Sequence, residues 1–221
     1  MSDCIVQTSE MVTLVGAGKV NKGILTDSLA IAPFLVAADG GAEMVLNCGK
    51  MPKKVIGDFD SISTDFLKQI PAADLHRIPE QETTDFDKCL RNINAPLILG
   101  VGFLGRRVDH QMASLSSLLQ FRDKPCILIG KHDVIFHVPD QLQMDLPVGL
   151  RFSLYPLLPV SGQSEGLVWP INGLTLTPGG RLGTSNEVKE ERVALSTDGP
   201  GMLAILPRLA LRSAVRALRA T

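Results

Sequence analysis

Residues 54–61 are Lys54-Val55-Ile56-Gly57-Asp58-Phe59-Asp60-Ser61, a short apolar run that leads into a glycine and two aspartates. The apolar run is typical of a buried strand, and residues two apart in an extended segment point the same way. Asp58 and Asp60 are therefore expected where a strand ends, placed to share one cation or its water shell. The alternative is an acidic turn whose carboxylates accept hydrogen bonds from nearby backbone N–H groups.

The segments on both sides of this stretch repeat the same alternation of strand and helix. Short apolar runs stand at residues 12–15, 34–38, 97–101, 126–129 and 134–138, and stretches with helical spacing stand at 24–31, 64–70, 84–93 and 110–121. This alternation favours βαβ units around a mostly parallel sheet, whose ligands gather beyond the carboxyl ends of the strands. We therefore expect an α/β domain over residues 1–138.

After Pro139 the pattern changes to short alternating segments that proline and glycine interrupt, at residues 150–155, 173–177, 192–197 and 202–206. This pattern predicts a small antiparallel β-domain over residues 139–221, with the boundary between Pro139 and Pro147. Arginines at four-residue intervals in 208–221 predict a basic tail on a surface helix. A tail that contacts RNA or a membrane is the less favoured alternative, because its charge is small and no aromatic residue accompanies it.

The composition excludes several classes of protein. The chain of 221 residues has 22 basic and 23 acidic side chains, so no overall field would attract nucleic acid or an anionic membrane. No signal-peptide pattern and no apolar run of about 20 residues is present, which predicts a cytoplasmic protein. The four cysteines are widely spaced and are expected to be reduced core thiols, and the histidines show neither zinc-site nor hydrolase spacing.

A second acidic segment, Thr84-Asp85-Phe86-Asp87-Lys88, has the pattern of a helix start. Thr84 or Asp85 could be only its N-cap. In combination with the first acidic segment, however, Asp85 gives a third carboxylate for one site. Magnesium prefers oxygen ligands and is commonly held by one or two carboxylates together with nucleotide phosphates. Asp58, Asp60 and Asp85 are therefore a candidate set of magnesium ligands.

Arginines follow the apolar run at 97–101, in the sequence Arg106-Arg107-Val108-Asp109-His110. An arginine at the end of a strand could bind phosphate oxygens in a bidentate manner, and Asp109 could orient that arginine or contact a substrate hydroxyl. The alternative is a helix start with solvated arginines, in which Asp109 interacts with the helix dipole. His110 is expected to have a surface or capping role.

Glycines follow two other strands. In Ala38-Asp39-Gly40-Gly41 the glycines would let a ligand approach the backbone while Asp39 reaches a hydroxyl or amine, although a plain turn has the same pattern. Residues 16–19 (GAGK) match neither a P-loop nor a complete dinucleotide-binding pattern and are consistent with a turn.

Five motifs in order, ADGGA (38–42), GDFDS (57–61), TDFDKCL (84–90), RVDH (107–110) and TSNE (184–187), closely resemble the thiamine pyrophosphokinase family. The resemblance extends nearly to Pro207. It implies an α/β domain that binds ATP and magnesium, a C-terminal all-β sandwich that binds thiamine, and a homodimer with thiamine sites between subunits. The residues implied are Asp58, Asp60 and Asp85 for magnesium and phosphates, Asp39, Gly40, Gly41, Lys88 and Arg107 for the nucleotide, Asp109 near the reacting centre, and Ser185 and Asn186 for thiamine.

The chain departs from the family pattern at two places. Arg106 stands where many members have a glycine, so the loop is less permissive or gains a phosphate contact. Some members stack an aromatic ring on thiamine from the strand after TSNE, whereas this chain has Pro200-Gly201-Met202-Leu203 there. Its single tryptophan, Trp169, lies upstream of TSNE.

The activity implied is transfer of pyrophosphate from ATP to thiamine by direct attack of the hydroxyl on the β-phosphorus, with release of AMP. Asp109 is the candidate that accepts or orients the hydroxyl proton. One alternative is a pyrophosphokinase for another alcohol, such as a hydroxymethyl pterin. Another is a nucleotide-sensing module that does not catalyse, but such a module would be expected to lack one of the candidate carboxylates, and all are present.

Overall fold

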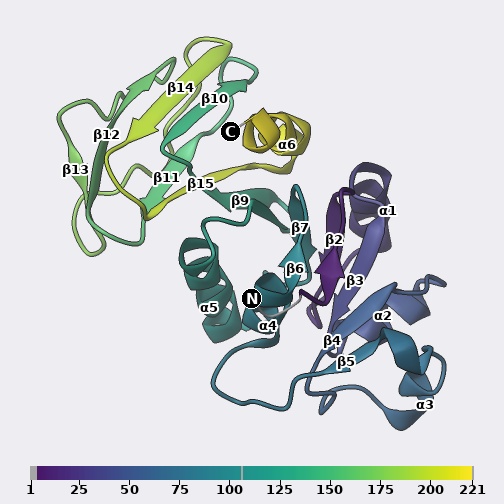
Figure 1. Ribbon diagram of the computed structural model, residues 1–221. Coiled ribbons are helices and arrows are strands. Elements are labelled where there is room, and N and C mark those ends of the chain that lie inside the picture. Colours follow the sequence, from purple (N-terminus) through teal and green to yellow (C-terminus); the bar gives the residue numbers. More distant parts are fainter. Residues whose placement is uncertain (1–3, 106, 221) are drawn as a thin grey trace. The chain divides into compact units, whose positions relative to one another are not determined.

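The computed structural model describes residues 4–105 and 107–220, and the chain divides into two compact units (Figure 1). The first unit extends to Ser117 and also includes Leu128–Lys131, and the second comprises Leu118–Ile127 and His132–Thr221. The chain therefore passes between the units more than once. Helix α5 (Val108–Gln120) and strand β8 (Cys126–Ile129) each contribute residues to both.

The first unit contains a parallel sheet with the order β7-β2-β3-β4-β5. The strands are β2 (Val12–Val15), β3 (Phe34–Ala38), β4 (Lys54–Gly57), β5 (Leu75–Arg77) and β7 (Ile98–Val101). Every residue of β2 and β7 is buried, as expected for central parallel strands covered on both faces. The parallel sheet expected from the apolar runs is thus present, and β5 is an edge strand that those runs did not indicate.

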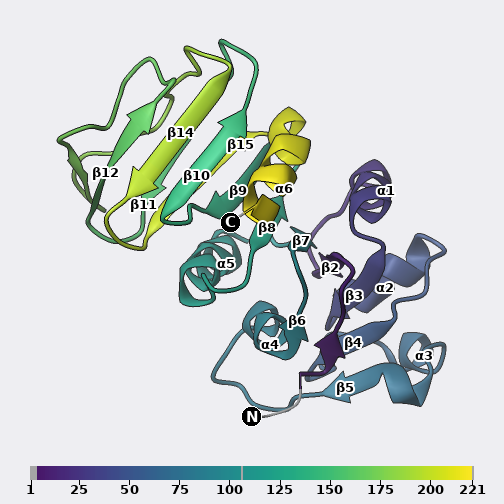
Figure 2. The same ribbon diagram turned by 45° about the horizontal axis from the view of Figure 1, so that its top comes forward.

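Helices cover both faces of this sheet. Figure 2 shows α4 (Asp85–Asn92) on one side of the sheet and α2 (Gly41–Asn47) and α3 (Thr64–Leu67) on the other. The unit also contains α1 (Lys22–Ile31), the short helix η1 (Ala72–Asp74), and a parallel pair of β1 (Val6–Gln7) and β6 (Ile93–Asn94). Asn21 is the N-cap of helix α1, and its side chain accepts a hydrogen bond from the Gly23 amide at 2.7 Å.

The second unit is built mainly from antiparallel strands. One sheet has the order β10-β14-β12-β13, formed by β10 (Gln141–Asp145), β14 (Arg192–Thr197), β12 (Val160–Glu165) and β13 (Thr175–Leu176). In addition, β15 (Met202–Pro207) pairs with both β11 (Ser153–Pro156) and β9 (Asp133–His137). Burial alternates along β10, because Leu142 and Met144 face the interior and their neighbours face solvent.

The basic tail forms a docked helix. After the short helix η2 (Arg208–Ala210), α6 (Leu211–Ala220) buries Leu211, Val215 and Leu218 and exposes Arg212 and Arg216. Figure 2 shows α6 beside β10 of the same unit. Its apolar face is thus used for packing, and the second unit contains a helix as well as strands. Across the described residues, the structure contains no helix with the length and apolar character that a membrane span requires.

Candidate active site

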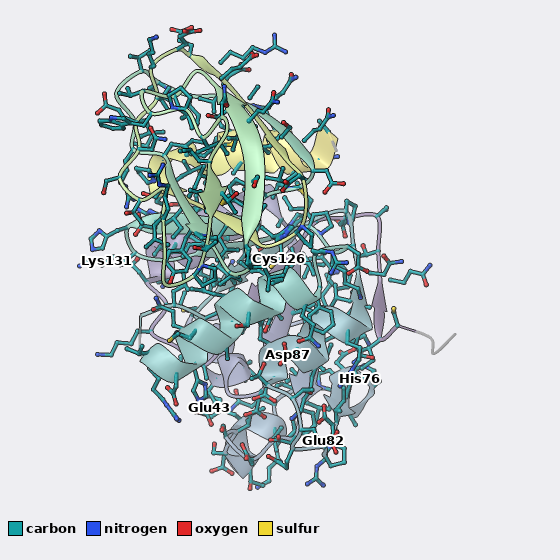
Figure 3. All side chains as sticks on the ribbon, turned by 90° about the vertical axis from the view of Figure 1, so that its left-hand side faces the viewer. Glu43, His76, Glu82, Asp87, Cys126 and Lys131 are labelled. Carbon is teal, nitrogen blue, oxygen red and sulfur yellow. The ribbon has the colours of Figure 1, made fainter. Side chains whose placement is uncertain are left out.

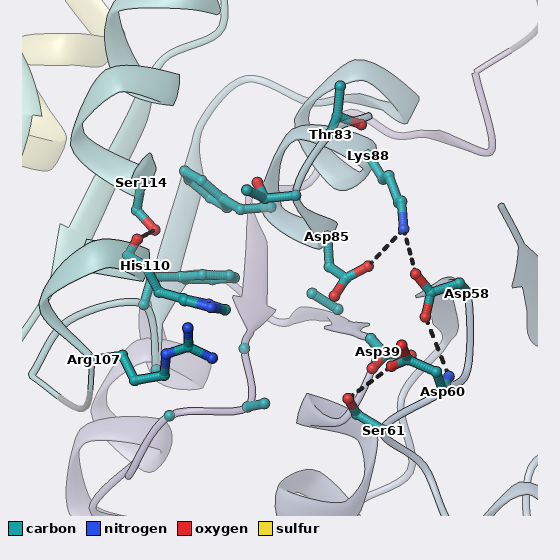
Figure 4. Close-up of a pocket in the computed structure, with 18 of the residues that line it drawn as sticks. Asp39, Asp58, Asp60, Ser61, Thr83, Asp85, Lys88, Arg107, His110 and Ser114 are labelled. Carbon is teal, nitrogen blue, oxygen red and sulfur yellow. Dashed lines mark hydrogen bonds and ion pairs between the residues drawn. The ribbon is translucent and has the colours of Figure 1, made fainter. Parts of the chain in front are cut away.

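A cavity of about 470 Å³ opens at the carboxyl ends of the parallel strands in the first unit (Figure 4). The loops after β2, β3, β4 and β7 line it, together with the first turns of α4 and α5. Parallel strands place their carboxyl ends at one edge of the sheet, so segments far apart in sequence meet there. The first four motifs of the sequence contribute residues to this cavity.

Three carboxylates come together in this cavity. One oxygen each from Asp39, Asp58 and Asp60 lies within 4.8 Å of the other two. The register of β3 and β4 explains the meeting, because Ala38 is opposite Ile56 and both strands end just before their aspartates. This group, the carboxylate cluster, is a candidate site for a cation with hard oxygen ligands.

The same carboxylates also hold their own turns. Asp39 and Phe59 have positive φ angles of 43° and 68°, and the Phe59 amide donates a hydrogen bond to Asp39 Oδ1 at 2.8 Å. The Asp60 amide donates to Asp58 Oδ1 at 3.2 Å, and Ser61 Oγ donates to Asp60 Oδ1 at 2.9 Å. The acidic turn considered from the sequence therefore exists, and it leaves other carboxylate oxygens available at the cavity.

Lys88 is a buried cation beside the cluster, with a side chain only 2% exposed. Its Nζ atom lies 2.7 Å from Asp58 Oδ2 and 3.1 Å from Asp85 Oδ1 (Figure 4). The hydrogen bond from Lys88 holds the pKa of Asp58 below its usual value, although burial acts in the opposite direction. Burial by itself would lower the pKa of Lys88, but the ion pairs with Asp58 and Asp85 outweigh burial and raise it.

Asp85 differs from the other expected magnesium ligands in its surroundings. It lines the cavity but is not among the three carboxylates that converge, and it reaches Asp58 through Lys88. Burial raises the pKa of Asp85 despite the hydrogen bond from Lys88. The structure thus brings Asp39, which was expected to contact the nucleotide, to the side of Asp58 and Asp60.

Arg107 and His110 line the cavity opposite the carboxylate cluster, and Ser114 lies one turn further along α5 (Figure 4). Arg107 donates two hydrogen bonds to Asp109, from Nε at 3.1 Å and from Nη2 at 2.6 Å. This contact lowers the pKa of Asp109, which is exposed and is not among the residues that line the cavity. Asp109 therefore contacts the arginine, as one of the two roles considered for it requires. Arg106, the other arginine of the motif, lies outside the described residues.

Close backbone approaches make two glycines necessary beside the cavity. A Cβ atom on Gly41 would lie 2.0 Å from the Val15 carbonyl oxygen, and one on Gly18 would lie 2.3 Å from the Gly102 carbonyl oxygen. Gly41 thus lets α2 pack against the end of β2, and neither Gly40 nor Gly41 lines the cavity. Gly18 lets the loop after β2 contact the loop after β7, and both loops line the cavity.

The TSNE motif lies in the second unit, in the segment between β13 and β14. Ser185 has a φ angle of 61°, and its amide donates a hydrogen bond to Ser153 Oγ at 3.0 Å. The Asn186 side chain is buried, accepts from the Trp169 amide at 3.1 Å and donates to the Trp169 carbonyl at 2.7 Å. Asn186 therefore holds the backbone of Trp169, a residue that is 60% exposed.

Comparison with known proteins identifies the family. A family model described as "Thiamin pyrophosphokinase, catalytic domain" matches residues 25–129, and one described as "Thiamin pyrophosphokinase, vitamin B1 binding domain" matches residues 137–201. Thiamin pyrophosphokinase 1 of Caenorhabditis elegans is 30% identical over 188 residues, which cover 75% of this chain and 76% of that protein. The chain belongs to the thiamine pyrophosphokinase family.

Other relatives agree with this assignment. Thiamine pyrophosphokinase 2 of Arabidopsis thaliana is 30% identical over 76% of this chain and 75% of its own length. Thiamine pyrophosphokinase 1 of the same plant is 28% identical over 66% of this chain, and the match spans 62% of its length. The family expected from the five motifs is confirmed, and so is its enzyme class, since the relatives are named thiamine pyrophosphokinases. The comparisons do not favour a pterin enzyme or a sensing module.

Solved structures of thiamine pyrophosphokinases share the fold. The enzyme from Geobacillus thermodenitrificans superimposes with a TM-score of 0.73 at 23% identity and covers 89% of this chain and 96% of its own. The enzyme from Candida albicans superimposes with a TM-score of 0.77 at 17% identity, covering 90% of this chain and 89% of its own. The fold of both halves of the chain is therefore that of the family.

Several residues that line the cavity were not among the site residues expected from the sequence. Residues 16–18 lie at the bend that follows β2 and His110 is exposed, as the turn and surface interpretations expected, and all of them also line the cavity. The position of residues 16–18 directly after an apolar run was the available signal. Phe86 and Phe103, whose ring centroids are 4.4 Å apart, also line it. A phenylalanine is most often a core residue, so its presence in the sequence did not mark either of them as part of a cavity.

Proposed function

We propose that this chain transfers the pyrophosphoryl group of ATP to the hydroxyl of thiamine, producing thiamine diphosphate and AMP. The observation that supports this proposal best is the cavity of the first unit, in which the carboxylate cluster faces Arg107 and His110. A triphosphate with its metal needs carboxylates on the side of the cation and an arginine on the side of the phosphate oxygens. Both are present in a member of the thiamine pyrophosphokinase family.

The residues of the cluster fit a magnesium ion. Asp39, Asp58 and Asp60 offer carboxylate oxygens close together, the ligand type that magnesium prefers. Among the described residues no ion pair is formed by Asp39 or Asp60, so their negative charge lacks a cation partner. Asp85, which contacts Lys88 as Asp58 does, is proposed as a further magnesium ligand. When bound, magnesium screens the phosphate charge that would repel an attacking oxygen.

The protein groups have separate roles in the proposed reaction. The thiamine oxygen forms a bond to the β-phosphorus while the bond from that phosphorus to the α,β-bridging oxygen breaks, so that AMP leaves with the bond electrons. Arg107 and Lys88 hold phosphate oxygens, and Asp39 helps to place the nucleotide. Asp109, whose carboxylate accepts a hydrogen bond from Arg107 at 2.6 Å, is the candidate that accepts or orients the hydroxyl proton, and reaching that proton requires it to turn from Arg107 toward the cavity.

Thiamine is proposed to bind at the second unit. Ser185 and Asn186 are the candidate contacts, within a proposed β-sandwich over residues 139–221, and residues 1–138 provide the ATP domain. The family resemblance favours a homodimer with composite sites. The balanced charge of the chain favours the absence of nucleic-acid and membrane partners, and a cytoplasmic location is proposed as well. Mixing an inactive Asp58→Asn protein with an inactive Asn186→Ala protein should then restore activity, and a fully active monomer in light scattering would exclude the composite site.

An acceptor screen tests the proposed reaction. The purified protein is incubated with magnesium and ATP and with thiamine, a hydroxymethyl pterin or no acceptor, and AMP and ADP are quantified. AMP produced in equal amount to thiamine diphosphate, with thiamine alone, is the expected result. ADP in place of AMP would indicate transfer of a single phosphoryl group, and AMP with the pterin would move the assignment to the alternative acceptor.

A further inference from the structure

Asp87 uses both carboxylate oxygens in a buried network behind the cavity, although the proposed reaction assigns it no role. Oδ2 accepts hydrogen bonds from the amide and the hydroxyl of Thr84, at 3.0 and 2.7 Å. Oδ1 accepts one from the hydroxyl of Ser117 at 2.6 Å. Asp87 and Ser117 are 8% and 2% exposed, and Asp87 is labelled in Figure 3.

The bonds on the two oxygens serve different purposes. Those on Oδ2 belong to the capping box of α4, in which the Asp87 amide also donates to Thr84 Oγ1 at 3.1 Å. A capping box is complete without the Oδ1 bond, so helix capping does not account for Ser117. The Ser117 hydroxyl also lies 2.9 Å from the carbonyl of Ala113, within its own helix, and has only one hydrogen to share between the two acceptors.

The Asp87–Ser117 bond therefore joins two helices that both contribute residues to the cavity. Thr84, Asp85 and Lys88 line the cavity from the first turns of α4, whereas His110 and Ser114 line it from α5. Ser117 stands three residues after Ser114, so the two serines lie on neighbouring turns of one helix face. Asp87 likewise stands three residues after Thr84. The link thus connects the helices one turn behind the residues that face the ligand.

We propose that the Asp87–Ser117 bond is a positioning contact that fixes the spacing between the lysine and carboxylates of α4 and the phosphate-binding side of α5. This positioning role rests on the proposed function, because the proposed function assigns ATP to the cavity that these helices line. A buried, charge-assisted hydrogen bond is strong, and small displacements of positioning groups have large effects on rate. Loss of the link therefore weakens the use of magnesium-ATP and leaves the KM for thiamine unchanged.

The test uses one variant and two matched comparisons on the same helix. Ser117→Ala removes the donor, Ser117→Thr retains a hydroxyl, and Ser116→Ala makes the same change at an exposed position one residue away. All are assayed well below their measured melting temperatures. We expect Ser117→Ala to lower kcat/KM for ATP about ten- to a hundredfold, with Ser116→Ala unchanged and Ser117→Thr close to the original protein.

A double-mutant cycle with Asp87→Asn keeps the inference testable if threonine does not fit. Asp87→Asn also weakens the capping box and should be the more severe single change. Adding Ser117→Ala to it should lower kcat/KM for ATP no further, because both changes disrupt the same Asp87–Ser117 bond. Additive effects, or a lower melting temperature with unchanged kcat and KM for ATP, would overturn the positioning role. Calorimetry of magnesium-ATP binding without thiamine separates the failure of the proposed reaction from the failure of the proposed positioning role of the Asp87–Ser117 bond. A wild-type protein that binds ATP but forms no AMP refutes the proposed reaction, whereas equal ATP affinity in Ser117→Ala and Ser116→Ala refutes the link.

Discussion

Asp58 and Asp85 should respond differently to the same substitution, because the structure gives them different partners. Asp58 belongs to the carboxylate cluster and binds Lys88 at 2.7 Å, with 10% of its side chain exposed. Asp85 lies outside the cluster, binds Lys88 at 3.1 Å and is 37% exposed. Replacement by asparagine keeps size and one acceptor oxygen but removes the charge, so it tests charge with little change of shape.

The expected size of the effect follows from these contacts. Breaking a buried ion pair costs about 3–5 kcal/mol when one charge is left unpaired. In the Asp58→Asn variant, however, Lys88 still has Asp85 as a partner. The loss of stability should therefore be nearer that of one hydrogen bond to a charged group, about 1.5–3 kcal/mol. For a chain of this size that corresponds to a fall in Tm of roughly 3–12 °C. The loss of one cluster ligand should in addition lower kcat about tenfold or more and raise the magnesium concentration needed for half-maximal rate.

The assay is AMP formation at fixed ATP and thiamine across a magnesium titration, with Tm measured for each variant. Asp58→Asn should show the larger shift in magnesium response and Asp85→Asn the smaller. Asp65→Asn is the matched control, since Asp65 is 90% exposed and pairs with Lys68 on the surface at 3.2 Å. An unchanged magnesium response in Asp58→Asn, with Tm also unchanged, would refute the cation site and leave the cluster as an acidic turn.

Three further outcomes are expected. Arg107→Ala should lower kcat/KM about ten- to a hundredfold, because Arg107 lines the cavity, and the loss should exceed that of Arg106→Ala. Equal, small losses in the two folded variants would show that Arg107 does not bind phosphate. Trp169 is the single tryptophan, is 60% exposed and lies in the unit that carries TSNE. Thiamine bound there should quench the tryptophan fluorescence. An emission spectrum that does not change at saturating thiamine would place the thiamine site elsewhere. Burial raises the thiol pKa of Cys89 and Cys126, so a thiol reagent should modify the other two cysteines first, and rapid modification of all four in the folded protein would contradict this.

The sequence by itself determined the family and most of the strands of the first unit. The apolar runs at 12–15 and 34–38 coincide with β2 and β3, because the periodicity of a buried strand is a property of adjacent residues. It also placed the aspartates and arginine of the motifs at strand ends. Edge strand β5 and the short alternating strands β10 and β12 were not predicted, since half-buried segments have a weaker pattern.

Only the tertiary structure decided which side chains meet. Asp39 joins Asp58 because β3 and β4 are neighbours whose register aligns Ala38 with Ile56, and spacing along the chain cannot reveal that alignment. Asp85 meets Lys88 one turn along the same helix, and Lys88 then reaches Asp58 thirty residues earlier. The TSNE asparagine holds the backbone of Trp169, a contact that no local pattern announces. Local periodicity depends on near neighbours, whereas a site depends on the order and register of the strands, which the whole sheet fixes at once.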